Sequence, residues 1–145
     1  MRVKDGNTPM RWSMIAVFGG IGILHVLSPD ALLRIMPDWV PEPRRVVVAT
    51  GWLEIAASLG LLFGRIAGLS GLVLALYAVA VFPANLKHAF QGIVVPGLPD
   101  TWWYHGPRLA LQPVIVWWCL YATGWIRWPF GIGLSQQNHK NNNLE

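Results

Sequence analysis

One acidic residue stands in the middle of an otherwise apolar run and is the first feature of this sequence that could do chemistry. The acid is Glu54, in the stretch 46–64, which has no other charged residue. A carboxylate at membrane depth is costly, so it usually faces a bundle interior or a wet cavity and finds a partner there. Thr50 and Ser58 lie one helical turn before and after Glu54 and share its face of a helix. Glu54 is therefore our candidate for carrying a proton or binding a polar ligand.

Four more polar residues occur where other apolar runs end or begin. They are His25, Asn85, Arg108 and Gln112. In an antiparallel bundle of four helices, the end of the first, the start of the second, the end of the third and the start of the fourth lie at the same face. We therefore expect these four side chains and Glu54 to surround one polar pocket. The alternative is a structural role, in which Glu54 bonds to Arg108 or Gln112 and fixes the helix register.

The elements that must position these residues are four windows with almost no charge, at 12–29, 46–64, 66–86 and 109–126. Each approaches the roughly 20 residues that a helix needs to cross a bilayer core about 30 Å thick. The chain has 145 residues, of which 54% are apolar and only 12% charged. We predict an all-α integral membrane four-helix bundle, antiparallel and up-down, with helices at about residues 12–28, 45–64, 66–87 and 108–127.

The segments between these helices are expected to lie on the membrane surface. Residues 30–43 combine three prolines with apolar side chains, which predicts an irregular cap between the first two helices. Residues 87–107 are long for a bundle loop and rich in aromatic residues, which predicts a lid between the last two. Pro83 lacks a backbone donor and is expected to kink the third helix. We predict one domain, 1–134, and a polar, disordered tail, 135–145, that includes part of a tag.

Tryptophan and charge placement indicate two membrane interfaces. The chain has nine tryptophans, and those near the predicted helix ends fit the headgroup region, where amphipathic rings are favoured. With the N-terminus inside, six Lys and Arg residues lie on the inner side and five on the outer side. Because the basic segment before the first helix usually dominates orientation, we predict that both termini are cytoplasmic and that the pocket opens outward. No basic stripe follows a phosphate backbone, so no nucleic-acid partner is predicted.

Several kinds of chemistry are excluded or disfavoured by residue spacing. Cys119 is the single cysteine, so an intramolecular dithiol relay is excluded and a buried, apolar thiol is expected. His88, His105 and His139 lie outside the predicted helices, so no metal site is predicted with His25. No phosphate-loop pattern surrounds the glycines at 19, 20 and 22. We therefore expect them to serve helix packing, since residues without side chains allow a neighbouring helix to approach closely.

Five short motifs occur in a fixed order along the chain: G-x-x-H with a later proline (Gly22, His25, Pro29), I-x-P-x-x-x-P (Ile35, Pro37, Pro41), G-x-x-E (Gly51, Glu54), V-F-P-A-N (81–85) and R-L-x-x-Q (Arg108, Leu109, Gln112). In this set the chain resembles the DoxX-like family of small four-helix bacterial membrane proteins, from residue 22 to about residue 118. The resemblance implies the four-helix fold and an inner-membrane location. It also implies redox association, since some relatives accompany thiosulfate:quinone oxidoreductase or oxidative-stress complexes.

The expected pocket and the resemblance together favour one function over two others. The favoured one is a redox-associated membrane subunit whose pocket binds a quinone-like or lipid-like molecule, with Glu54 and His25 handling protons. The alternative is a non-catalytic membrane binding or assembly factor for a partner complex. A small transporter is disfavoured, because four helices rarely provide two gates. The expected partners are the lipid bilayer, a membrane or redox protein and a second copy of the chain, and both leading functions leave open whether the protein is an enzyme.

Overall fold

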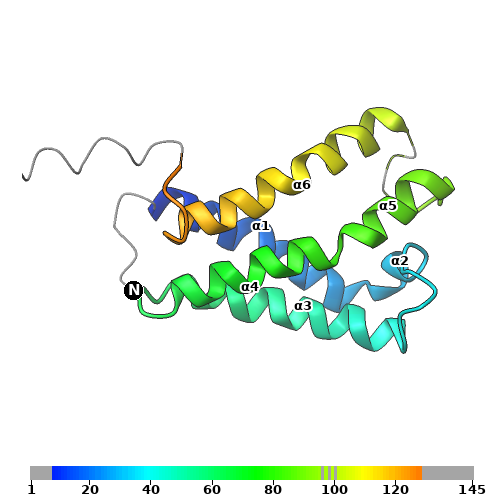
Figure 1. Cartoon of the computed structure of the whole chain (residues 1–145). Helices are drawn as coiled ribbons and strands as arrows, with labels where there is room; N and C mark the ends of the chain where they lie inside the picture. Colours follow the sequence, from blue (N-terminus) through cyan, green and yellow to red (C-terminus); the bar gives the residue numbers. More distant parts are fainter. Residues whose placement is uncertain (1–7, 96, 98, 100, 129–145) are drawn as a thin grey trace, which may run out of the picture.

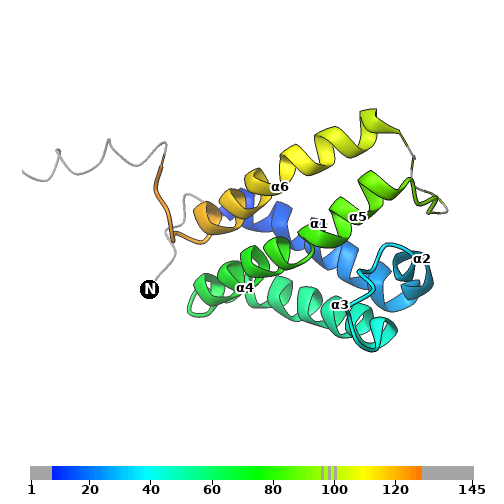
Figure 2. The ribbon, with the colours of Figure 1, turned by 45° about the vertical axis from the view of Figure 1, so that its right-hand side comes forward.

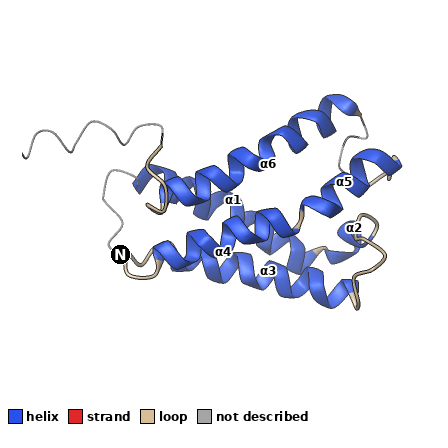
Figure 3. Ribbon diagram, viewed as in Figure 1, coloured by secondary structure: helices blue, strands red, loops and turns tan. Residues whose placement is uncertain are grey.

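The structure is a computed structural model that describes residues 8–95, 97, 99 and 101–128. Within these ranges the fold is all-α, as predicted, and holds no strand (Figure 3). The helices are α1 (Thr8–Leu27), α2 (Pro29–Leu33), α3 (Pro43–Gly60), α4 (Ala67–Ala80), α5 (Phe82–Gln91) and α6 (Trp102–Ala122). The predicted tail, 135–145, and the predicted domain end at 134 lie outside the described residues.

The four long elements run alternately up and down. In Figure 1, α1, α3 and α4 lie alongside one another, and the second half of α6 runs beside α4. Toward the end that carries α2, α5 and the first half of α6 diverge from α1 and α3, which both Figure 1 and Figure 2 show. The bundle is therefore tightly packed at one end and spread apart at the other.

The packed end contains the apolar core. Met14, Leu61, Leu74 and Cys119 are fully buried there, so the expectation of a buried Cys119 thiol is confirmed. The guanidinium of Arg11 donates from Nε to the carbonyl of Leu61 at 3.1 Å, which satisfies a carbonyl that the end of α3 leaves without a helical partner. This end thus has both a close-packed core and a capped helix terminus.

The third predicted helix is two segments in the structure. It runs from Ala67 to Gln91 as α4 and α5, which are separated at Val81. Pro83 lies in the first turn of α5 and cannot donate a hydrogen bond to the carbonyl of Val79. The break therefore occurs where the proline was expected to bend the helix.

The fourth helix begins earlier than predicted, and the expected lid is mostly helical. Residues 87–91 belong to α5 and residues 102–107 to α6, so the connection between them is only 92–101. Pro107, the last residue of the predicted connection, lies inside α6. The first turns of α6 are stabilised by packing on α5, where the rings of His88 and His105 meet edge to face at 4.6 Å between centroids.

Two described stretches are long and apolar enough to cross a membrane, α1 (Thr8–Leu27) and the combined helix Ala67–Gln91. Large apolar side chains also face outward on the other two long helices, among them Trp52, Leu53 and Leu59 on α3 and Leu111 and Val114 on α6. Such an outer surface is unusual for a soluble protein, since large exposed apolar patches normally mark a membrane or partner surface.

Candidate functional site

Two glycines bring α1 and α3 into backbone contact and thereby place the predicted acid. A Cβ atom on Gly22 would lie 2.7 Å from the carbonyl oxygen of Gly51, and one on Gly51 would lie 2.8 Å from that of Gly22. Only residues without a side chain allow such an approach, which is a common device in helix pairs of membrane proteins. His25 and Glu54 each follow one of these glycines by three residues, so they meet across the same contact.

His25 is the partner of Glu54. The Nδ1 atom of His25 lies 2.8 Å from Oε2 of Glu54, and the Glu54 side chain is 1% exposed. The hydroxyl of Tyr77, on α4, lies 3.4 Å from the same Nδ1 atom. We call these three residues the acid cluster. The structural alternative, in which Glu54 bonds to Arg108 or Gln112, is not what the structure shows. The helix α1 packs directly on α3, whereas Arg108 and Gln112 bond to Asn85 of α5.

The other three predicted residues form a second cluster on α5 and α6. Nη2 of Arg108 donates to Oδ1 of Asn85 at 2.6 Å, and Nδ2 of Asn85 donates to Oε1 of Gln112 at 3.1 Å. Nε2 of Gln112 then donates to the backbone carbonyl of Ala78, in the last turn of α4. Since an arginine has donors only, every bond in this chain runs in one direction.

His88 completes the second cluster. Its Nδ1 atom lies 2.8 Å from Nη1 of Arg108, and because the guanidinium can only donate, Nδ1 is the acceptor and the imidazole is neutral. The ring of Tyr104 lies under the same guanidinium, 5.6 Å from Cζ to the ring centroid, where a cation is attracted to the π-face. We call Asn85, His88, Arg108 and Gln112 the arginine cluster.

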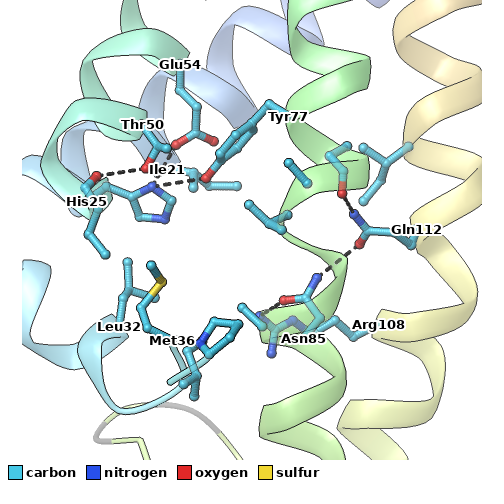
Figure 4. A pocket seen from close by; sticks show the side chains of 18 of the residues that line it. Ile21, His25, Leu32, Met36, Thr50, Glu54, Tyr77, Asn85, Arg108 and Gln112 are labelled. Atoms are coloured by element: carbon cyan, nitrogen blue, oxygen red, sulfur yellow. Dashed lines mark hydrogen bonds and ion pairs between the residues drawn. The ribbon is translucent and has the colours of Figure 1, made fainter. Parts of the chain in front are cut away.

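Both clusters contribute to the lining of one cavity of about 710 Å³, the arginine cluster through Asn85, Arg108 and Gln112. Figure 4 shows His25, Glu54 and Tyr77 on one wall and Asn85, Arg108 and Gln112 on the opposite wall. All five residues singled out from the sequence therefore lie around the same space, although they form two groups in place of one connected set. Most of the remaining lining is apolar, with contributions from Phe18, Ile21, Leu32, Met36, Leu111 and Ile115.

Sequence reasoning missed Tyr77 and His88. Tyr77 precedes Asn85 by eight residues, which is close to two helical turns, so helical spacing from Asn85 could have found it. His88 was expected in a loop, because the third helix was ended at residue 87. It lies in α5, and His105 lies in α6. Both histidines are helical because α5 continues beyond the third apolar window and α6 begins before the fourth.

The geometry defines what the cavity can bind. Its two polar walls present a carboxylate with an imidazole and a phenol on one side, and a guanidinium with two amides on the other. Between them lies apolar surface, so a ligand would need a polar group and a hydrophobic body. In the part of the chain that the structure describes, no group of three or more His, Cys, Asp or Glu side chains is placed to hold a metal ion.

Comparison with known proteins gives a family and no activity. A family profile described as "Domain of unknown function (DUF8561)" matches residues 14–123. The matched region includes both clusters and every residue that lines the cavity. Neither a curated protein nor a solved structure matches the chain. The residues that line the cavity are therefore the only basis for assigning its chemistry.

Proposed function

We propose that this chain, which belongs to the DUF8561 family, is a multi-pass protein of the bacterial inner membrane whose cavity binds a quinone-like or lipid-like molecule. The observation that carries the proposal is the cavity of about 710 Å³, with an acid cluster and an arginine cluster on opposite walls of an otherwise apolar lining. A cavity of this volume falls within the roughly 300–1,000 Å³ of small-molecule sites.

The lengths and the apolar outer surfaces of the four long elements support the proposal. The helix α1 and the combined stretch Ala67–Gln91 have the length and hydropathy of membrane spans. The helices α3 and α6 carry large exposed apolar side chains along the bundle, which lipid would cover. In that setting Glu54, His25 and Arg108 are ionisable groups within membrane-spanning helices, and such residues usually face a binding cavity or a proton path.

A quinone ring suits the arrangement of donors. It has two carbonyl oxygens at opposite ends, and the cavity offers donors on two opposite walls. Arg108 can donate on one side, and His25 or Tyr77 on the other. The isoprenoid tail of such a molecule would lie against the apolar lining. In this function the protein is a redox-associated subunit, as the DoxX-like motifs imply, and the acid cluster exchanges protons with the bound ring.

A second function is a non-catalytic binding or assembly factor that holds a structural lipid and contacts a partner complex. The exposed apolar side chains of Phe90, Val94 and Trp102, at the end of α5 and the start of α6, favour this alternative. They lie outside the cavity lining, so a cavity ligand would not cover them. In this case the bound molecule stabilises the bundle and undergoes no reaction.

Identification of the bound molecule tests the proposal. The protein is extracted in a neutral detergent, and co-purified compounds are identified by mass spectrometry. Ala84→Phe places a ring in the cavity, since Ala84 lines it. Ala49→Phe is the matched control, because Ala49 is exposed on α3 and does not line the cavity. We expect one quinone or lipid species to be retained by the wild type and by Ala49→Phe, and to be lost from Ala84→Phe.

The identity of that species separates the two functions. A quinone whose reduction and reoxidation can be followed in the purified protein supports the redox subunit, whereas a phospholipid with a co-purified protein partner supports the assembly factor. Equal retention of all compounds by the three proteins would show that the cavity holds no specific ligand, and both functions would then be wrong.

A further inference from the structure

We propose that the arginine cluster is a subsite for an oxyanion, a phosphate or carboxylate carried on an apolar tail. This inference rests on the proposed function and deepens it, because it assigns a charge and an orientation to the molecule in the cavity. It is carried by the charge balance around Arg108, by the direction of the hydrogen bonds it makes and by the position of the apolar lining.

Within the described part of the chain, Arg108 has no acidic partner beside the cavity. Its guanidinium donates to Oδ1 of Asn85 and Nδ1 of His88, and both of these acceptors belong to neutral groups. Among the described residues, no carboxylate oxygen lies within the 4.0 Å that defines an ion pair with Arg108. A charge in an apolar surrounding is costly unless an opposite charge accompanies it, so a ligand that supplied a negative charge would be favoured.

The guanidinium is also oriented to bind an oxyanion. It has five N–H donors, and the bonds to Asn85 and His88 use one N–H on each of its two terminal nitrogens, so other N–H groups remain for a ligand. These bonds and the Tyr104 ring hold the guanidinium in one position, which lowers the entropy lost on binding. A planar, fixed guanidinium is the group best suited to bind carboxylate or phosphate oxygens through two parallel hydrogen bonds.

The opposite wall sets the orientation. Glu54 carries the carboxylate of the acid cluster, so an anionic group would be repelled there and attracted to Arg108. Leu111 and Ile115 line the cavity three and seven residues after Arg108, deeper along α6. Phe18 and Ile21 line it on α1, seven and four residues before His25. The polar group therefore lies near the helix ends and the tail toward the bundle middle, as lipids lie in a bilayer.

Binding to the purified full chain in a neutral detergent tests this subsite. The probe is radiolabelled dodecyl phosphate, measured by scintillation proximity, with unlabelled dodecanol as the competitor that has the same tail and no charge. Charge-assisted hydrogen bonds are among the stronger ones, so we expect dodecyl phosphate to bind about tenfold or more tightly than dodecanol. Inorganic phosphate lacks the tail and should compete at least about tenfold less well than dodecyl phosphate.

Three variants connect the preference to Arg108. Arg108→Gln should reduce the affinity for dodecyl phosphate to that for dodecanol, and Arg108→Lys should retain part of the preference, because the charge stays. Arg45→Gln is the control, since Arg45 is an exposed cation on α3 outside the cavity, and it should bind as the wild type does. The wild-type comparison of phosphate and alcohol needs no variant, so it decides the matter even if Arg108→Gln does not fold.

Each contrary result has a distinct meaning. Equal affinity of the wild type for dodecyl phosphate and dodecanol would overturn the oxyanion subsite, and so would an unchanged affinity in Arg108→Gln. Inorganic phosphate that competes as well as dodecyl phosphate would show a site for free anions and overturn the amphipathic ligand. If decylubiquinone binds without any advantage for the charged probe, only this inference fails. If no probe binds, the proposed function fails with it.

Discussion

At the scale of single residues, the contact between His25 and Glu54 determines how a buried acid is tolerated. The carboxylate is almost fully buried, and the Nδ1 atom of the His25 imidazole lies 2.8 Å from it. Breaking a buried ion pair by removing one partner costs about 3 to 5 kcal/mol, because the other charge is left alone. Replacing Glu54 by glutamine removes that charge. The losses of stability caused by substituting His25 and Glu54 should therefore not be additive.

We therefore predict strong coupling between His25 and Glu54. His25→Ala should destabilise the protein, and Glu54→Gln in the same chain should recover much of the loss. A double-mutant cycle, measured by unfolding in detergent with increasing sodium dodecyl sulfate, gives the coupling free energy. The matched control is the cycle for Glu54 and Arg108, which lie on opposite walls and should show much weaker coupling. Additive effects in the first cycle would mean that the imidazole does not compensate the acid.

Asn85 connects Arg108 to Gln112, and its removal should break the arginine cluster. Asn85→Leu leaves the Oε1 atom of Gln112 without its donor and one Arg108 nitrogen without its acceptor. Each buried polar group left without a partner costs about 1 to 3 kcal/mol. Because two groups lose their partners, we predict a loss of about 2 to 6 kcal/mol of stability, measured in the same unfolding assay. Gln91→Leu, an exposed change at the end of α5, should have little effect, and an equally small effect of Asn85→Leu would contradict the network.

At the scale of elements, the approach of α1 to α3 depends on Gly22 and Gly51. An added methyl group on either would meet a backbone carbonyl oxygen at 2.7 or 2.8 Å, and backbone cannot move aside as a side chain can. Overpacking of this kind typically costs about 1 to 3 kcal/mol. It would also separate His25 from Glu54, because both residues reach the cavity from this contact.

We predict that Gly22→Ala and Gly51→Ala each destabilise the protein and reduce the amount of ligand retained on purification. Gly20→Ala is the control, since a Cβ atom at Gly20 meets nothing within 4 Å, and it should be neutral or stabilise by up to about 1 kcal/mol through helix propensity. Thermal unfolding in detergent checks the order of the three variants. A Gly22→Ala protein as stable as Gly20→Ala would show that the helices are not in backbone contact.

The same contact explains what could be predicted from the sequence and what could not. Helical content, the break near Pro83 and the end of the bundle that carries the polar residues follow from local composition. Which residue pairs with Glu54 depends on which helix approaches closest. Gly22 and Gly51 bring α1 onto α3, so His25 meets Glu54, while α6 packs on α4 and α5, so Arg108 meets Asn85 and His88. Local spacing contains no information on that choice, because both partners suit a carboxylate.

The start of α6 shows a second limit. Residues 102–107 contain tryptophans, a histidine and a proline, and their local preference does not indicate a helix. Packing of His105 against His88 stabilises the helical turn, and this contact is between residues far apart in the sequence. A prediction from local pattern therefore begins the helix too late, at Arg108, and assigns the preceding turns to a loop.

At the scale of the whole molecule, the proposed orientation in the membrane can be checked with single cysteines. Gly64 lies in the connection between α3 and α4, and Thr101 lies just before α6 at the opposite end of the bundle. We predict that Thr101→Cys reacts with a membrane-impermeant thiol reagent in intact cells and that Gly64→Cys does not, both in a Cys119→Ala background. The opposite labelling would place the cavity mouth on the cytoplasmic side. Labelling of both only after cell lysis would mean that the chain does not cross the membrane.

The one-directional chain of hydrogen bonds from Arg108 through Asn85 and Gln112 to the Ala78 carbonyl crosses the break between α4 and α5. It therefore ties α5 to the last turn of α4 by way of α6. An occupant that binds the remaining N–H groups of Arg108 would leave this chain intact and hold its first donor in place. The angle at the Val81 break would then vary less. We expect the spread of angles between these two helices to narrow when the cavity is filled, so a spin-label pair placed on α4 and α5 would register occupancy from outside the binding site.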